Sequence, residues 1–73
     1  MSIFLNDQDC KWSIAEPSTN TYIITLTHSP TGKSLQSSPL FYQGHEFEQD
    51  IVCKLAKMDL VKRMGALLRA ATE

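Results

Sequence analysis

The chain has 73 residues, which is enough for one domain and no more. Its seven basic and eight acidic residues give a formal net charge of −1, so it lacks the basic excess of a dedicated nucleic-acid-binding protein. No apolar stretch approaches the roughly 20 residues of a transmembrane helix, and a membrane partner is therefore not expected.

The first residues and the cysteines bear on location. Met1 to Asp9 contains no basic segment followed by an apolar run, so we expect no signal peptide. Without export, the two cysteines Cys10 and Cys53 are expected to remain reduced thiols. The sequence therefore predicts a cytoplasmic protein without a disulfide.

Two strands are predicted at the start of the fold. Residues 10–14 alternate between apolar and polar side chains, which is the pattern of a half-buried strand. Turn-forming residues follow at 16–20, and the β-branched and aromatic segment 22–28 forms the second strand. The shared apolar face of this pair is expected to carry Trp12, Ile14, Tyr22, Ile24 and Leu26.

A third strand completes the predicted sheet. Residues 33–38 are long enough to pair back with the second strand, which would place Leu35 on the same apolar face. Pro39 cannot donate a ladder hydrogen bond, so it ends the strand or marks an edge. The predicted fold class is α+β, a three-stranded antiparallel β-meander over about residues 10–42 and then a long C-terminal helix packed on one sheet face.

The loop before the third strand, His28-Ser-Pro-Thr-Gly-Lys-Ser34, ends in the letters G-K-S, like a phosphate-binding P-loop. That motif needs another glycine five residues before Gly32, where this chain has Thr27. The segment from Ser29 to Gly32 instead has the residues of a type I turn, with proline second and glycine fourth. We therefore predict a hairpin loop with Gly32 at positive φ and no nucleotide site.

A helix is predicted over about residues 45–71, because this segment contains no proline and one internal glycine. Its apolar residues form two sets at helical spacing. The first set is expected to cover the sheet: Phe47, Ile51, Leu55 and Met58. The second set lies almost opposite the first: Leu60, Val61, Met64, Leu67, Leu68 and Ala71.

Two arrangements of this helix remain open. A straight helix would leave the second set for another chain. A break near Met58-Asp59, with Asp59 as the N-cap of a second helix, would instead turn both sets toward one core. We favour a continuous or mildly kinked helix, because the segment K-M-D-L contains no glycine or proline.

The residues that carry chemistry do not have the spacing of a known site. Cys10, His28, His45 and Cys53 are zinc-ligand types, but the closely spaced pairs of a zinc site are absent from the sequence. Cys53 and His45 would lie about 12 Å apart along a helix, too far for a nucleophile–base pair. We expect no metal, no cofactor, no small-molecule substrate and no enzymatic activity.

A three-stranded sheet backed by one helix resembles several small DNA-binding modules, including the integrase arm-binding domains. The strand of Trp12, the strand of Tyr22 and the segment S-L-x-S-S-P-x-F at residues 34–41 also resemble the CedA family of bacterial cell-division activators. The resemblance transfers no functional residue. The sheet face that would bind nucleic acid consists of Lys11, Ser13, Ile23, Thr25, Thr27 and Ser34.

The late part of the helix is the predicted site, because it combines an apolar centre with charged edges. Its expected contact residues are Leu60, Arg63, Met64, Leu67, Leu68, Arg69 and Ala71. We predict a non-enzymatic, cytoplasmic protein-interaction module that binds a protein partner, forms a homodimer, or both. In size and composition it is like the phage- or prophage-encoded regulators and inhibitors of larger host proteins. The alternative is a weak nucleic-acid-binding domain that uses the sheet face.

Overall fold

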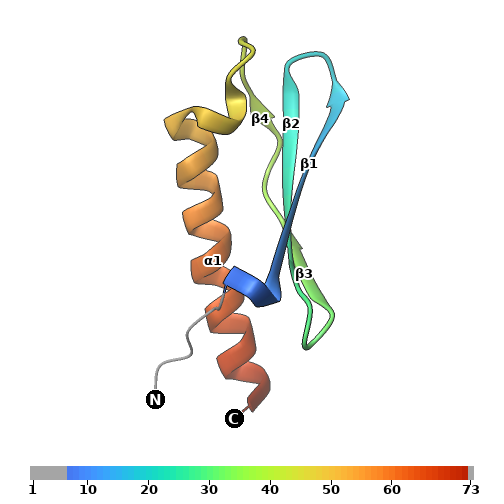
Figure 1. The fold of residues 1–73 in the computed structure, drawn as a ribbon, viewed down its shortest axis with the longest axis vertical. Coiled ribbons are helices and arrows are strands. Elements are labelled where there is room, and N and C mark those ends of the chain that lie inside the picture. The colour runs from blue at the N-terminus through green and yellow to red at the C-terminus, as the bar shows by residue number, and fades with distance from the viewer. Residues whose placement is uncertain (1–6, 73) are drawn as a thin grey trace.

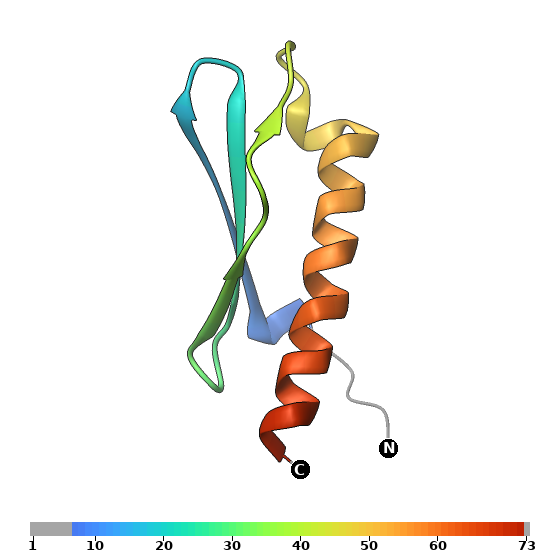
Figure 2. The same ribbon diagram turned by 180° about the vertical axis from the view of Figure 1, so that it is seen from behind.

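A computed structural model of the protein describes residues 7–72, and the side chains of residues 8–70. A 3₁₀ turn (Asp7–Asp9) leads into an antiparallel sheet, and a long helix, α1 (Ile51–Thr72), lies along one face of that sheet. Figures 1 and 2 show these two layers from opposite sides. The predicted α+β class, with a C-terminal helix on one sheet face, is confirmed.

The sheet contains the three predicted strands and one that was not predicted. β1 (Cys10–Ser18), β2 (Thr21–His28) and β3 (Lys33–Gln36) follow one another as a meander, with β2 in the centre. β4 (Leu40–Phe41) pairs with the start of β2, on the edge that β3 has left. The chain pairs with β2 again directly after Pro39, so the proline separates β3 from β4 without ending the sheet.

The strand register confirms the predicted apolar face. Trp12 lies opposite Leu26, and Leu26 lies opposite Leu35 on the other side of β2. Directly opposed residues in antiparallel strands point to the same side of the sheet. Trp12, Leu26 and Leu35 therefore point to the side of the sheet on which α1 lies.

The loop from Ser29 to Gly32 is the predicted hairpin connection between β2 and β3. Gly32 has a φ of 71°, and its N–H donates to the carbonyl of His28 at 2.8 Å. His28 Nδ1 also lies 2.9 Å from the Thr31 hydroxyl. The loop uses glycine for its backbone conformation, as expected from the sequence.

Helix α1 begins six residues later than the predicted start at 45. Residues Phe47–Gln49 form a separate 3₁₀ turn, η2, and Asp50 has extended backbone between the two elements. The Asp50 carboxylate accepts a hydrogen bond from the Val52 N–H at 3.0 Å, so Asp50 is the N-cap of α1.

The helix continues through Met58-Asp59 without a break, as favoured from the sequence. Asp59 caps no second helix. It forms an ion pair with Arg63 one turn later, at 2.9 Å. One straight helix can turn only one of its two apolar sets toward the sheet.

The set that faces the sheet is not the one predicted from the sequence. The buried core consists of Ile24, Leu26, Phe47, Cys53, Leu60, Met64 and Leu68. Ile51, Leu55 and Met58, which were expected to cover the sheet, are exposed. Phe47 is buried as predicted, but it precedes the corner at Asp50, so its position does not fix the buried face of α1.

Candidate interaction surface

The late helix residues form the core of this chain instead of an exposed face. Leu60 and Met64 have no exposed surface, and Leu68 is 6% exposed. Leu67 is half-buried and packs against the same cluster. The prediction that these residues present an apolar surface to a partner is therefore wrong. Together with Cys53 they follow the helix over four turns, so burying them covers more apolar area than burying Ile51, Leu55 and Met58 would.

The charged members of the predicted site lie at the surface. Arg63 pairs with Asp59, and its side chain is 49% exposed. Arg69 is exposed in the last turn of α1. The side chain of Ala71 lies outside the described residues. Neither arginine borders an exposed apolar centre, because Leu60, Met64 and Leu68 are buried.

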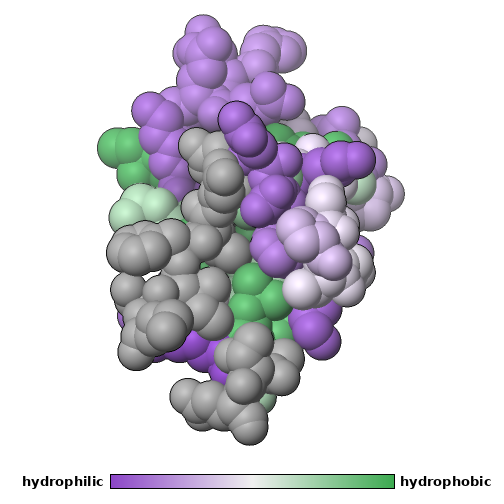
Figure 3. Space-filling view, turned by 60° about the horizontal axis from the view of Figure 1, so that its bottom comes forward, coloured by the Kyte–Doolittle hydropathy of each residue, from purple (hydrophilic) through white to green (hydrophobic). Residues whose placement is uncertain are grey.

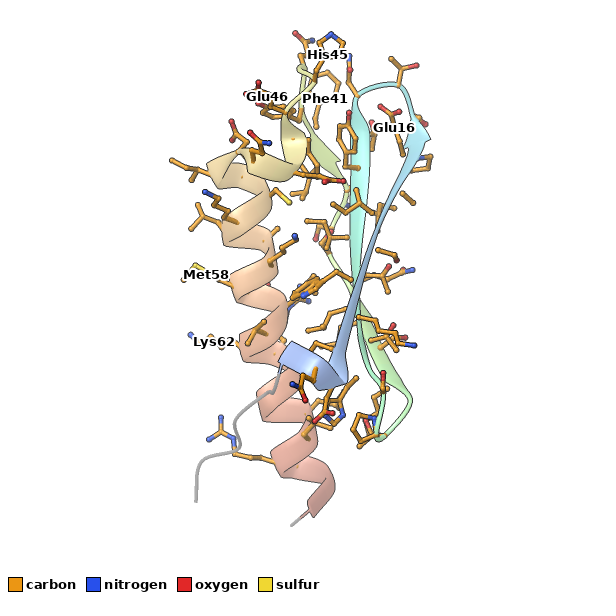
Figure 4. All side chains as sticks on the ribbon, in the orientation of Figure 1. Glu16, Phe41, His45, Glu46, Met58 and Lys62 are labelled. Carbon is orange, nitrogen blue, oxygen red and sulfur yellow. The ribbon has the colours of Figure 1, made fainter. Side chains whose placement is uncertain are left out.

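The exposed apolar surface lies on the opposite side of α1. Ile51 is 68% exposed, Leu55 58% and Met58 66%, and their spacing of four and three residues places them on one line. We call these three residues the outer stripe. Figure 4 shows Met58 and the following Lys62 pointing away from the sheet. In Figure 3 hydrophobic surface is visible at the margin of the molecule on the side of α1.

Two half-exposed valines extend the outer stripe at its edges. Val52 and Val61 are each 39% exposed. At 100° per residue, they lie on opposite sides of the stripe. The result is an apolar band about three turns long on the outside of a helix whose inner side is already packed. Isolated apolar residues are common on protein surfaces, but an aligned group of this kind indicates a contact site.

Charges of opposite sign lie at the two ends of the outer stripe. Glu46 and Glu48 are exposed in the segment before α1, and Lys62 is exposed one turn after Met58. Within the described residues neither Glu48 nor Lys62 forms an ion pair, whereas Asp59 is paired with Arg63. The surface therefore has an acidic end, an apolar centre and a basic end.

A second partly exposed area lies where α1 leaves β1 incompletely covered. The helix packs mainly on β2 and β3, and most of the edge strand β1 lies farther from the helix (Figure 1). Trp12 on β1 is 36% exposed, and the Lys57 ammonium lies 5.4 Å from the centre of its ring. This cation–π contact covers the indole from the helix side. One face of the Trp12 ring is thus already in contact with Lys57 of the same chain.

A polar hollow of about 480 Å³ lies at the end of the sheet near the β1–β2 turn. It is lined by Glu16, Asn20, Tyr22, Gln43, Gly44 and His45, and Figure 4 labels Glu16 and His45 at this end. Burial, then the Glu16 carboxylate, raise the pKa of Tyr22. Tyr22 also stacks on Phe47 with ring centres 4.2 Å apart. Sequence reasoning missed this hollow because its residues come from two stretches, 16–22 and 43–45, that only the fold brings together.

The most perturbed carboxylate has a structural role at the helix start. The Val52 N–H and the Tyr42 hydroxyl, which donates at 2.9 Å, both lower the pKa of Asp50. The same hydrogen bond to Asp50 raises the pKa of Tyr42. This pair joins the segment after β4 to the first turn of α1. Its shifted pKa values are explained by the cap and by the hydrogen bond.

The outer face of the sheet offers little for nucleic acid. Lys33 pairs with His28, two positions before Leu35, so it points toward the α1 side of the sheet. Lys11 is then the one basic residue on the outer face of the described strands. The exposed Phe41 follows the inward Leu40 and extends this face at one corner. A single lysine can contact few phosphate groups, so this face is poorly suited to binding nucleic acid.

In the part of the chain that the structure describes, no group of three or more metal-ligand side chains lies close together. Neither does any described helix have the length and hydropathy needed to cross a bilayer.

Comparisons with protein-family models, with curated proteins and with solved structures found no significant match to this chain. The assignment of function therefore depends on the chain's own geometry.

Proposed function

We propose that this chain is a non-enzymatic protein-interaction module that docks on a protein surface through the outer stripe of α1. The observation that supports the proposal is the exposure of Ile51, Leu55 and Met58 on one helix line. Their inner counterparts already fill the core, so these three side chains have no packing role in the described fold. A helix laid by its apolar face into a groove or against another helix is a common mode of protein recognition.

The size of the outer stripe sets the strength of the expected contact. Fully burying a leucine, isoleucine or methionine contributes about 1.5–3 kcal/mol, and these three are already partly buried. Covering the remaining area contributes roughly 4 kcal/mol, which is comparable to the lower estimates of the cost of association. The edges around Val52, Val61 and Lys62 must add to the affinity. The contact is therefore expected to be weak.

The kind of role that fits this surface is regulatory. A chain of 73 residues with a balanced charge and one contact face is suited to masking a site on a larger protein. We therefore propose a small regulator or inhibitor as the role of the module. The sheet face, with Lys11 as its basic residue, supports the nucleic-acid alternative less well.

Photo-crosslinking in cells tests the proposal directly. A benzophenone amino acid in place of Leu55 should give protein crosslinks, and a second substitution, Ile51→Asp, should remove them. The matched control places the same probe at the exposed Ser13, on the outer face of the sheet. Crosslinks that are equally strong from Ser13, or that survive Ile51→Asp, would refute a docking surface on α1.

A further inference from the structure

We propose that the occupant of the outer stripe is a second copy of this chain, bound antiparallel across a two-fold axis near Leu55. This inference rests on the proposed function of the same surface. It is carried by the order of charges along the chain: acidic residues in the segment before α1, then the apolar outer stripe, then a basic residue on α1. A two-fold interface requires a surface that is complementary to itself, and this order has that property.

The positions of the charges fit an antiparallel pair. Lys62 lies on α1 two turns after Leu55, and Glu48 lies in η2, just before α1 begins. With the axis near Leu55, Lys62 of each chain comes toward the end of α1 that Glu48 precedes in the other chain, and the apolar residues meet in the centre. A parallel pair would instead place Lys62 against Lys62 and Glu48 against Glu48. The interface thus selects one orientation.

Two other charges near the outer stripe have electrostatic partners within the chain. Asp59 is paired with Arg63. The positive charge of Lys54 is close enough to Asp50 to contribute to the lowered pKa of that carboxyl. Glu48 and Lys62 form no ion pair within the described residues, so an antiparallel copy would be able to pair them.

The area of the surface predicts a weak dimer. α1 has 22 residues, so it is about 33 Å long and about 10 Å across, and its outer face offers a few hundred Å². Stable interfaces bury about 800 Å² on each partner. The dimer should therefore form at micromolar concentrations and dissociate on dilution.

Charge reversal with mixing tests this arrangement. Analytical ultracentrifugation should show reversible dimers of the unmodified chain. Lys62→Glu alone and Glu48→Lys alone should each weaken the dimer about tenfold, because each replaces two attractive contacts by two repulsive ones. The double variant should dimerise like the unmodified chain. Mixing the two single variants should also restore dimers, because every cross-chain pair is then attractive.

The outcomes separate this inference from the proposed function. A monomer at high micromolar concentration that still crosslinks a different protein through Leu55 would overturn the dimer and leave the docking surface in place. A monomer that gives no crosslink from Leu55 would overturn both. Dimers that are insensitive to Leu55→Asp, or single variants that are not restored by mixing, would overturn the antiparallel arrangement. Cosedimentation of the monomer with anionic vesicles, lost in Leu55→Asp, would also overturn the dimer.

Discussion

Asp50 is the residue on which the start of α1 depends, and its carboxylate makes the stability of the fold sensitive to acid. The folded-state pKa of Asp50 is lowered from 3.8, chiefly by the Val52 N–H and the Tyr42 hydroxyl. A lowered folded pKa means that the contribution of the carboxylate is fully present above pH 3.8 and is lost as the pH falls through the folded value. Asparagine also caps helices but does not titrate.

We therefore expect Asp50→Asn to lose less stability than the unmodified chain on acidification below pH 3.8. Urea midpoints measured across this pH range give the two slopes. Glu46→Gln is the matched control, since it removes an exposed carboxylate from the same segment. Equal slopes for Asp50→Asn and the unmodified chain would show that the acid sensitivity arises elsewhere.

Gly32 and Gly65 have different structural roles, and substituting each with alanine should shift stability in opposite directions. Gly32 has a φ of 71°, a conformation that costs a residue with a side chain about 1–2 kcal/mol. Gly65 lies inside α1, and a methyl group added there would meet nothing within 4 Å. We expect Gly32→Ala to destabilise the fold by about 1 kcal/mol and Gly65→Ala to stabilise it by about 1 kcal/mol. Urea denaturation at low protein concentration measures both. A loss of stability in Gly65→Ala would contradict the open space around this position, because it would mean that the added methyl group clashes with another part of the chain.

At the scale of elements, the two sides of α1 should respond very differently to the same substitution. Leu60 is fully buried against the sheet, whereas Leu55 is 58% exposed. We expect Leu60→Ala to cost about 2–5 kcal/mol, because it leaves a cavity, and Leu55→Ala to change stability by less than about 0.5 kcal/mol. Denaturant unfolding followed by circular dichroism, at a concentration where the chain is monomeric, checks the pair. The reverse order of costs would mean that the outer stripe, and not Leu60, packs on the sheet.

The strands and the hairpin loop could be predicted because they are encoded locally. Alternation places Trp12 opposite Leu26, and the glycine of the Ser29–Gly32 loop specifies its backbone. The face of α1 could not be predicted from periodicity, because the segment carries two apolar sets of similar hydropathy. The choice depends on where the helix begins. The Asp50 cap separates Phe47 from α1, so a pattern counted through Phe47 selected the wrong side.

Because the wrong face of α1 was predicted to be buried, the candidate site was placed on the wrong side of the helix. It is still an exposed apolar face of α1. Both apolar sets belong to one straight helix, and only one can pack on one sheet. Leu60, Met64 and Leu68 were assigned to a partner and are core, while Ile51, Leu55 and Met58 were assigned to the core and are exposed. The sequence therefore indicated that α1 has a surplus apolar face. Only the tertiary arrangement identified which face that is.

At the scale of the whole molecule, the proposed dimer should add stability to a fold with a small core. Seven hydrophobic residues are buried in the described chain. Domains of this size bury only about 60% of the surface that the unfolded chain exposes, so they are often marginally stable alone. A dimer that binds the folded state but not the unfolded chain adds stability by mass action. The thermal midpoint should therefore rise with protein concentration.

The expected size of this effect follows from the length of the chain. A change of 1 kcal/mol shifts the midpoint of a domain this small by about 4–8 °C, and a tenfold rise in concentration above the dissociation constant contributes about 0.7 kcal/mol per chain. We expect an increase of about 3–5 °C for each tenfold rise in that range. Leu55→Asp should unfold at one midpoint at all concentrations. The double variant Lys62→Glu with Glu48→Lys should show the same concentration dependence as the unmodified chain. A midpoint of the unmodified chain that does not move with concentration would mean that the fold is stable as a monomer, and it would overturn the dimer.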